Sequence, residues 1–405
     1  MLPSNLASPS PSQALAHQPS TLPRNKRKKT PFQSILIPNT KMPLLLLDFD
    51  GTITQHDTLH PLVTLAISSS SPTSSSLPTP STSSTISTPN TTSNHNSTPT
   101  TAHSHDHDDN HERLNALWEK IVRDYVADHA AHLDSYSPRP DERTTLEQEL
   151  AFLESLGEVE RKSVERVSGA GFFRRLLESG VGGVGSGGGK EGLDGRLTGA
   201  GVGGVGGEKE AEEGIRERKG EGESPLQWLG REAVKTKKVE VRKGFGEFMK
   251  DIKGREEQGW EVAVVSVNWS GGFIRGVVGE GCGEVITKEK VVANAIGSPE
   301  GRVEGPVELG GAVLVTAGDK LRGMKSLKKD KERVVYFGDS TTDLACLVEA
   351  DLGIVIADDG ESKVLKTLRR VGLEVPHVGD CDSGSKLVWA RDFGEVIQSK
   401  VMDGI

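Results

Sequence analysis

The chain contains the stretch Leu44-Leu45-Leu46-Leu47-Asp48-Phe49-Asp50-Gly51-Thr52, and this stretch decides the fold that we expect. Four consecutive leucines form a short, continuous apolar run, which is typical of a strand buried on both faces of a parallel sheet. Two acids follow directly, and Asp-Gly is a common turn signal. The stretch therefore predicts a central strand with Asp48 and Asp50 at its C-terminal end.

Further short apolar runs lie in the C-terminal half of the chain and alternate with segments of helical periodicity. We expect strands at 262–265, 291–296, 334–337 and 353–357, and a hairpin at 302–307 around Gly305-Pro306. Strands that alternate with helices are typical of an α/β protein with a parallel sheet. The sequence therefore predicts an α/β fold with a Rossmann-like parallel sheet, in which ligands bind beyond the C-terminal ends of the strands.

A mostly helical insertion separates the first strand from the others. Apolar residues recur at helical spacing near 114–126, 146–153 and 164–173, and apolar residues at 226–229 indicate a further helix. Stretches rich in Ser, Thr, Pro or Gly are unable to bury a core and predict disorder. The expected domains are a disordered basic tail at 1–41, a catalytic core at 42–56 and 241–405, and a helical cap at 57–240 with disordered inserts at about 68–110 and 180–224.

Charge and cysteine content narrow the classes of function. Residues 1–41 contain six basic residues and no acid, so their charge is +6. Because the net charge of the whole chain is −9, the remaining residues carry a charge of −15. An acidic body argues against nucleic-acid binding, and no apolar run is long enough to span a membrane. Three cysteines without metal-ligand spacing indicate a reducing compartment.

The basic tail leaves the location of the protein open. We expect the cytoplasm, with the nucleus and then the mitochondrion as alternatives, because the tail contains a basic run and resembles a transit peptide in composition. Met42 directly precedes the first strand and would itself serve as a start. The sequence does not determine an oligomeric state.

Polar residues follow three of the expected strands. Asp48 and Asp50 follow the first, Ser266 follows 262–265, and Asp339 and Asp343 follow 334–337. The C-terminal ends of parallel strands share one edge of a sheet, so these side chains are expected to converge. Clustered carboxylates repel one another, and a bound hard cation such as Mg²⁺ usually neutralises this repulsion.

The same residues resemble the sequence motifs of the haloacid dehalogenase (HAD) superfamily. The stretch from Asp48 to Thr52 resembles the first motif, Ser266 the second, Lys320 in Gly318-Asp319-Lys320 the third, and the stretch from Gly338 to Asp343 the fourth. The four occur in the family's order. The helical insertion after the first motif resembles the C1 cap of the phosphoserine-phosphatase-like members, and Ala293-Asn294 resembles a segment of that subfamily.

The resemblance implies a role for each of these residues. Asp48 would be the nucleophile, and Asp50 would act as general acid and then as general base. Ser266, Asn268 and Lys320 would contact the phosphate, with Lys325 and Lys328 as alternatives to Lys320. The expected Mg²⁺ ligands are Asp48, Asp339 and the backbone carbonyl of Asp50, with Asp343 holding the metal or its water.

These roles imply Mg²⁺-dependent hydrolysis of a small phosphorylated metabolite through an aspartyl-phosphate. A phosphomutase and a catalytically silent binding or regulatory protein are the alternatives. The segment Ser266-Val267-Asn268-Trp269-Ser270 departs from the Ser-Gly-Gly-Phe of phosphoserine phosphatases, which argues against phosphoserine as the substrate. The chain looks closer to uncharacterised fungal HAD-like proteins and to the methionine-salvage phosphatase of the same superfamily.

Overall fold

The computed structural model describes residues 43–69, 105–181, 223–255, 259–283, 290–297, 299–329, 333–382, 384–403 and 405. The expected basic tail at 1–41 and most of the two expected inserts lie outside these residues. The ends of the first insert differ from the expectation, because helix α1 continues to Ser69 and helix α2 begins at His105. Within the described part of the chain, no helix is long and apolar enough to cross a membrane.

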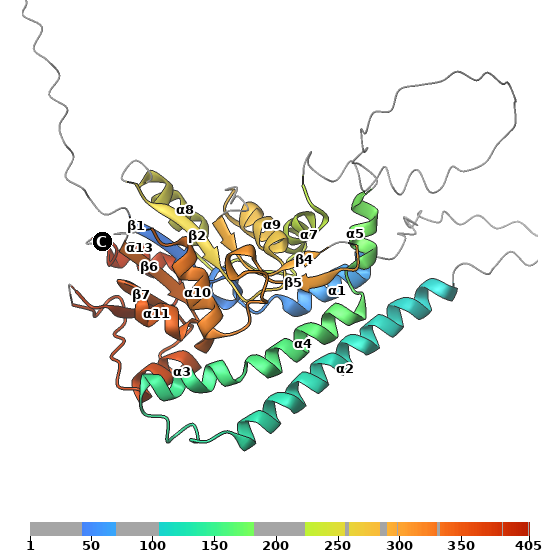
Figure 1. The fold of residues 1–405 in the computed structure, drawn as a ribbon. Coiled ribbons are helices and arrows are strands. Elements are labelled where there is room, and N and C mark those ends of the chain that lie inside the picture. The colour runs from blue at the N-terminus through green and yellow to red at the C-terminus, as the bar shows by residue number, and fades with distance from the viewer. Residues whose placement is uncertain are drawn as a thin grey trace, which may run out of the picture. The chain divides into compact units, whose positions relative to one another are not determined.

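A six-stranded parallel sheet forms the centre of the structure (Figure 1). Its strands, in spatial order, are β3 (Val291–Val292), β2 (Glu261–Val265), β1 (Pro43–Leu47), β6 (Arg333–Gly338), β7 (Leu352–Ile356) and β8 (Leu387–Ala390). The leucine run is β1, and it lies between β2 and β6 with every residue buried. The predicted α/β fold with a parallel sheet is therefore confirmed.

The leucines of β1 alternate between two hydrophobic cores, one on each face of the sheet. Leu45 and Leu47 pack in the core that includes side chains of α8 (Phe245–Gly254), α9 (Gly271–Cys282) and α13 (Phe393–Ser399). Leu44 and Leu46 pack in the core that includes α10 (Ala317–Leu327), α11 (Leu344–Glu349) and α12 (Lys363–Arg370). Because successive strand residues point to opposite faces, a run without polar residues is needed to fill both cores.

The described parts of the chain between β1 and β2 are mostly helical, as expected. Its helices are α1 (Leu59–Ser69), α2 (His105–Ser135), α3 (Leu146–Ser155), α4 (Gly157–Ala170), α5 (Arg174–Val181), α7 (Pro225–Lys235) and α8. The long helices α2 and α4 lie side by side (Figure 1), and the hydroxyl of Tyr125 donates a hydrogen bond of 2.8 Å to Glu160 between them. The division into a core and a cap stays a prediction.

Helix α7 falls within the predicted cap range of 57–240, yet it packs directly on α9 of the predicted core. The two backbones approach so closely that a Cβ at Gly276 would lie 1.9 Å from the carbonyl oxygen of Gln227. Only glycine fits at such a contact.

Two predictions about strands were wrong. The expected strand at 291–296 is interrupted: β3 joins the parallel sheet, and β4 (Ala295–Gly297) pairs antiparallel with β5 (Arg302–Glu304). The hairpin therefore turns before Arg302 and not around Gly305-Pro306. The cause is Asn294, whose buried side chain accepts a hydrogen bond of 2.7 Å from the amide of Leu314 and donates one of 2.9 Å to its carbonyl, which fixes the break.

One strand of the sheet was not predicted. The last clear strand in the sequence is at 353–357, but β8 follows it and pairs in parallel with β7 at the edge of the sheet. It has four residues, and a run this short gives too little periodicity to be recognised.

Candidate active site

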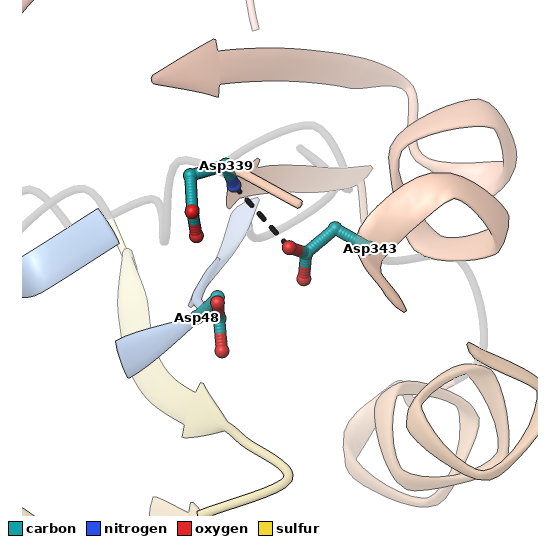
Figure 2. A group of neighbouring side chains, drawn as sticks. All are labelled: Asp48, Asp339 and Asp343. Carbon is teal, nitrogen blue, oxygen red and sulfur yellow. Dashed lines mark hydrogen bonds between the residues drawn. The ribbon is translucent and has the colours of Figure 1, made fainter. Parts of the chain in front are cut away.

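The C-terminal ends of β1, β2 and β6 meet because these strands are neighbours in the sheet. The amide of Asp48 still donates a hydrogen bond of 2.9 Å to the carbonyl of Phe337, so the ladder continues to the first acid. Asp339 follows β6 directly, and Asp343 lies one turn later. Figure 2 shows the side chains of Asp48, Asp339 and Asp343 gathered at this edge.

These three aspartates form a compact group, which we call the acid group. One carboxylate oxygen from each lies within 4.8 Å of the others. Nζ of the fully buried Lys320, from α10, lies 2.7 Å from Oδ1 of Asp48 and 2.6 Å from Oδ1 of Asp343. The alternative Lys325 instead pairs with Glu349 at 3.4 Å, and half of its side chain is exposed. The structure thus brings Lys320, and not Lys325, to the acids.

Asp343 is held by hydrogen bonds to both of its oxygens. Oδ1 accepts from Lys320 and, at 2.7 Å, from the hydroxyl of Tyr336, while Oδ2 accepts from the amides of Asp339 at 3.2 Å and Ser340 at 3.0 Å. The dashed line in Figure 2 marks the bond from Asp339. A carboxylate with this many donors is well suited to fix Lys320 and the loop after β6.

The electrostatics of the acid group show a shortage of positive charge. Burial raises the pKa of Asp48 well above its usual value, and the charge of Asp343 adds to this effect. Burial and then the charge of Asp343 raise the pKa of Asp339 to about 7. Burial alone would lower the pKa of Lys320, but the charges of Asp343 and Asp48 outweigh it and raise that pKa. One lysine does not balance three carboxylates.

The acid group suits a hard divalent cation. Its donors are carboxylate oxygens, which Mg²⁺ prefers, and the buried Oδ1 of Asp48 lacks a well-aligned hydrogen bond beyond its ion pair with Lys320. Gly51 has a φ of 73°, and a Cβ there would lie 2.2 Å from Oδ2 of Asp339. Glycine at this position therefore leaves room for the carboxylate.

Asp50 lies two residues beyond Asp48, but its carboxylate belongs to a different group of side chains. Oδ1 accepts hydrogen bonds from the amide of Thr58 at 2.8 Å and from its hydroxyl at 2.6 Å, and Oδ2 accepts one of 2.9 Å from Asn268. Burial, followed by the charge of Asp57, raises the pKa of Asp50 to about 6. A carboxyl group with this pKa exchanges a proton readily near neutral pH.

Ser266 and Asn268 follow β2 and are both buried. Oγ of Ser266 accepts a hydrogen bond of 3.1 Å from the amide of Asn268, which leaves its hydroxyl hydrogen available to a ligand. The side-chain amide of Asn268 donates to Asp50 and, at 3.0 Å, to the hydroxyl of Thr58. These donations favour a positioning role for Asn268 over the expected contact with phosphate.

Three side chains of this region had no role predicted from the sequence. Thr52 donates a hydrogen bond of 3.0 Å to Oδ1 of Asp339, and Thr58 holds Asp50. Arg242 donates one of 2.7 Å to the carbonyl of Gly51 from 191 residues away. Thr52 lies inside the first motif, so its position could have been recognised as part of the site from the sequence. Nothing in the local sequence indicates that Arg242 belongs to the site.

Two cavities lie beside these strand ends. One of about 380 Å³ is lined by Asp57, Leu59, His60, Trp118, Ile121, Val122, Tyr125, Glu160, Ser163, Val164, Val267, Trp269, Val315 and Thr342, and we call it the aromatic cavity. A second of about 650 Å³ shares Tyr125, Glu160, Val315 and Thr342 with it, and we call it the basic cavity because its lining also includes Lys363 and Lys366. The two cavities therefore adjoin each other.

Comparisons with known proteins give structural neighbours alone. No protein-family model matches the chain, and no curated protein matches it. Similar solved structures include a phosphoserine phosphatase described as a phospho-aspartyl intermediate analogue, at 14% identity and a TM-score of 0.32, covering 88% of this chain and 98% of that one. Another is a phosphoserine phosphohydrolase-like protein from Francisella tularensis subsp. tularensis SCHU S4, at 12% identity and a TM-score of 0.36, covering 88% and 99%. Similarity at this level supports nothing about activity or substrate.

Proposed function

We propose that this chain is a phosphatase that hydrolyses a small phosphomonoester with Mg²⁺ through an aspartyl-phosphate on Asp48. The observation that carries the proposal is that Asp48 and Asp50 have different surroundings. Asp48 is buried, paired with Lys320 and next to Asp339, whereas Asp50 lies apart among neutral hydrogen-bond donors with a pKa of about 6. A nucleophile and a proton-transfer group need these two different environments.

In the first half of the reaction, a carboxylate oxygen of Asp48 attacks phosphorus and the bond to the ester oxygen breaks. The leaving alkoxide takes the proton of Asp50, so the alcohol departs neutral. In the second half, the carboxylate of Asp50 accepts a proton from a water molecule as that water attacks the phosphorus of the acyl phosphate. Inorganic phosphate leaves, and both acids return to their starting forms.

Other side chains supply charge and position. Lys320 places its ammonium between Asp48 and Asp343, where it orients the nucleophile and attracts the phosphate. Ser266 can donate its hydroxyl hydrogen to a phosphate oxygen. Asp48, Asp339 and the backbone carbonyl of Asp50 would hold Mg²⁺, which when bound neutralises phosphate oxygens and the acid group.

The test is hydrolysis of a panel of phosphomonoesters by the purified chain, with inorganic phosphate as the readout. We expect release with Mg²⁺ and none after treatment with EDTA, with recovery when Mg²⁺ is restored. Transfer of phosphate to a second hydroxyl, without release, would identify a mutase instead. A chain that is inactive on the whole panel and binds no Mg²⁺ would contradict the proposal.

A further inference from the structure

The aromatic cavity lies against the proposed reaction centre. Its lining residue Val267 directly follows Ser266, and its lining residue Thr342 directly precedes Asp343. The negative charge of Asp57, another lining residue, is close enough to raise the pKa of Asp50. A phosphomonoester with its phosphate at Asp48 would therefore place its organic part in or beside this cavity.

Aromatic rings form much of the wall. The buried rings of Trp118 and Trp269 pack edge to face with their centroids 6.2 Å apart, and Tyr125 adds a third ring. Nε1 of Trp118 donates a hydrogen bond of 2.9 Å to Nδ1 of His60.

Two carboxylates line the cavity, those of Asp57 and Glu160. Glu160 accepts the hydrogen bond from Tyr125, and Oδ1 of Asp57 accepts one of 2.9 Å from the amide of Leu59. Among the residues that the structure describes, no Lys or Arg lines this cavity, and none forms an ion pair with either carboxylate. Burial raises the pKa of Glu160, which shows that its charge is costly without a counter-charge.

We propose that the aromatic cavity selects phosphomonoesters whose organic part carries an ammonium group and no carboxylate. This substrate class rests on the proposed phosphatase function. An ammonium group would supply Asp57 and Glu160 with a counter-charge that no Lys or Arg of the described lining provides, and aromatic faces attract cations. A substrate carboxylate would meet like charges there, and the cations of the neighbouring basic cavity, Lys363 and Lys366, do not line this one.

Three matched probes test the proposal. Phosphoethanolamine carries the ammonium group, ethyl phosphate lacks it, and phosphoserine adds a carboxylate to phosphoethanolamine. We expect kcat/KM for phosphoethanolamine to exceed that of the other two by about tenfold, the size of one favourable charge contact in a partly enclosed site.

The substitution Glu160→Gln keeps an acceptor for the hydroxyl of Tyr125 and removes the charge. It should lower kcat/KM for phosphoethanolamine by about tenfold and change that for ethyl phosphate by less than about twofold. The control is Glu158→Gln, on the same helix, because Glu158 is exposed and pairs with Lys162 at 3.1 Å. A purely structural role for Glu160 would lower both rates together.

The outcomes separate this inference from the function on which it rests. Hydrolysis of ethyl phosphate as fast as phosphoethanolamine, or faster hydrolysis of phosphoserine, would overturn the inference and leave the phosphatase standing. Faster hydrolysis of phosphoserine would also assign the carboxylate to the basic cavity. Failure to hydrolyse any phosphomonoester with Mg²⁺ would overturn the proposed function, and the inference with it.

Discussion

Asp48 and Asp50 are two residues apart in the sequence, yet they lie in regions of opposite character. Asp48 is in the acid group, beside two further carboxylates and a fully buried lysine. Asp50 is among the hydroxyl and amide groups of Thr58 and Asn268. The first region combines like charges with one opposite charge, whereas the second surrounds Asp50 with neutral hydrogen-bond donors. In the proposed mechanism, local surroundings, and not residue type, therefore separate the nucleophile from the acid-base group.

The largest expected effect is on Asp48. Asp48→Asn keeps the shape of the side chain and removes the attacking charge, so turnover should fall by about 10,000-fold or more. The measurement is phosphate release under single-turnover conditions. Because the substitution also removes one of the buried like charges, the metal-free protein should unfold at the same or a higher temperature. Activity that survives in this variant would refute the covalent step.

The next largest effect is expected for Asp50→Asn, which removes the proposed proton-transfer group. Loss of the general acid and base should slow hydrolysis of an alkyl phosphate by about 100- to 10,000-fold. With p-nitrophenyl phosphate, whose leaving group needs no proton, phosphate should instead accumulate on Asp48 and be detectable as added mass on that peptide. Equal loss of activity on both substrates, with no phosphoenzyme, would mean that Asp50 is not the proton-transfer group.

Lys320→Met tests the balance of charge in the acid group. Removal of one partner from a buried ion pair leaves uncompensated carboxylates, which costs about 3–5 kcal/mol of folding free energy. Urea denaturation measures this loss, and Mg²⁺ should restore part of it. Lys325→Met is the control, because the exposed pair with Glu349 should contribute less than about 1 kcal/mol. Equal destabilisation by the two substitutions would contradict the assignment of Lys320 as the central cation.

The acid group also predicts how the stability of the metal-free protein depends on pH. The pKa of Asp339 is about 7 in the folded chain and 3.8 when exposed, so its protonated form is favoured by folding. The stability from this group is complete below about pH 4 and lost as the pH rises through about 7. Mg²⁺ should therefore raise the unfolding temperature more at pH 8 than at pH 5.5, as differential scanning fluorimetry can show. An equal rise in unfolding temperature at pH 8 and pH 5.5 would argue against these carboxylates as the metal site.

The smallest expected effect concerns the neutral donors around Asp50. The hydroxyl of Thr58 donates to the charged form of Asp50 and so lowers its pKa, and Thr58→Val should raise that pKa above about 6. Since the first step needs protonated Asp50, kcat/KM should decline at a pH higher by about half a unit. Thr64→Val, at a position that bonds to the carbonyl of His60, is the control. An unmoved pH profile would remove Thr58 from the site.

Sequence by itself determined the elements that local patterning encodes. The leucine run can be buried on both faces only between two hydrophobic layers, so it predicted a central strand. The acids that follow the run were therefore expected at the edge where the parallel strands end. Lys320 was assigned by its resemblance to the third motif, and the packing of α10 brought it to Asp48. Strong apolar periodicity and strand-end chemistry are short-range signals, and they were sufficient for the fold class.

Tertiary structure decided what depends on groups far apart in the chain. The break at Asn294 follows from hydrogen bonds to Leu314, and the turn at Gly51 is held by Arg242. Neither partner is visible in a local window of sequence. The direction of the Asp50 side chain, away from the acid group, was likewise fixed by Thr58 and Asn268. The hydrogen-bond partners and the burial of a side chain depend on which distant segments the fold brings beside it.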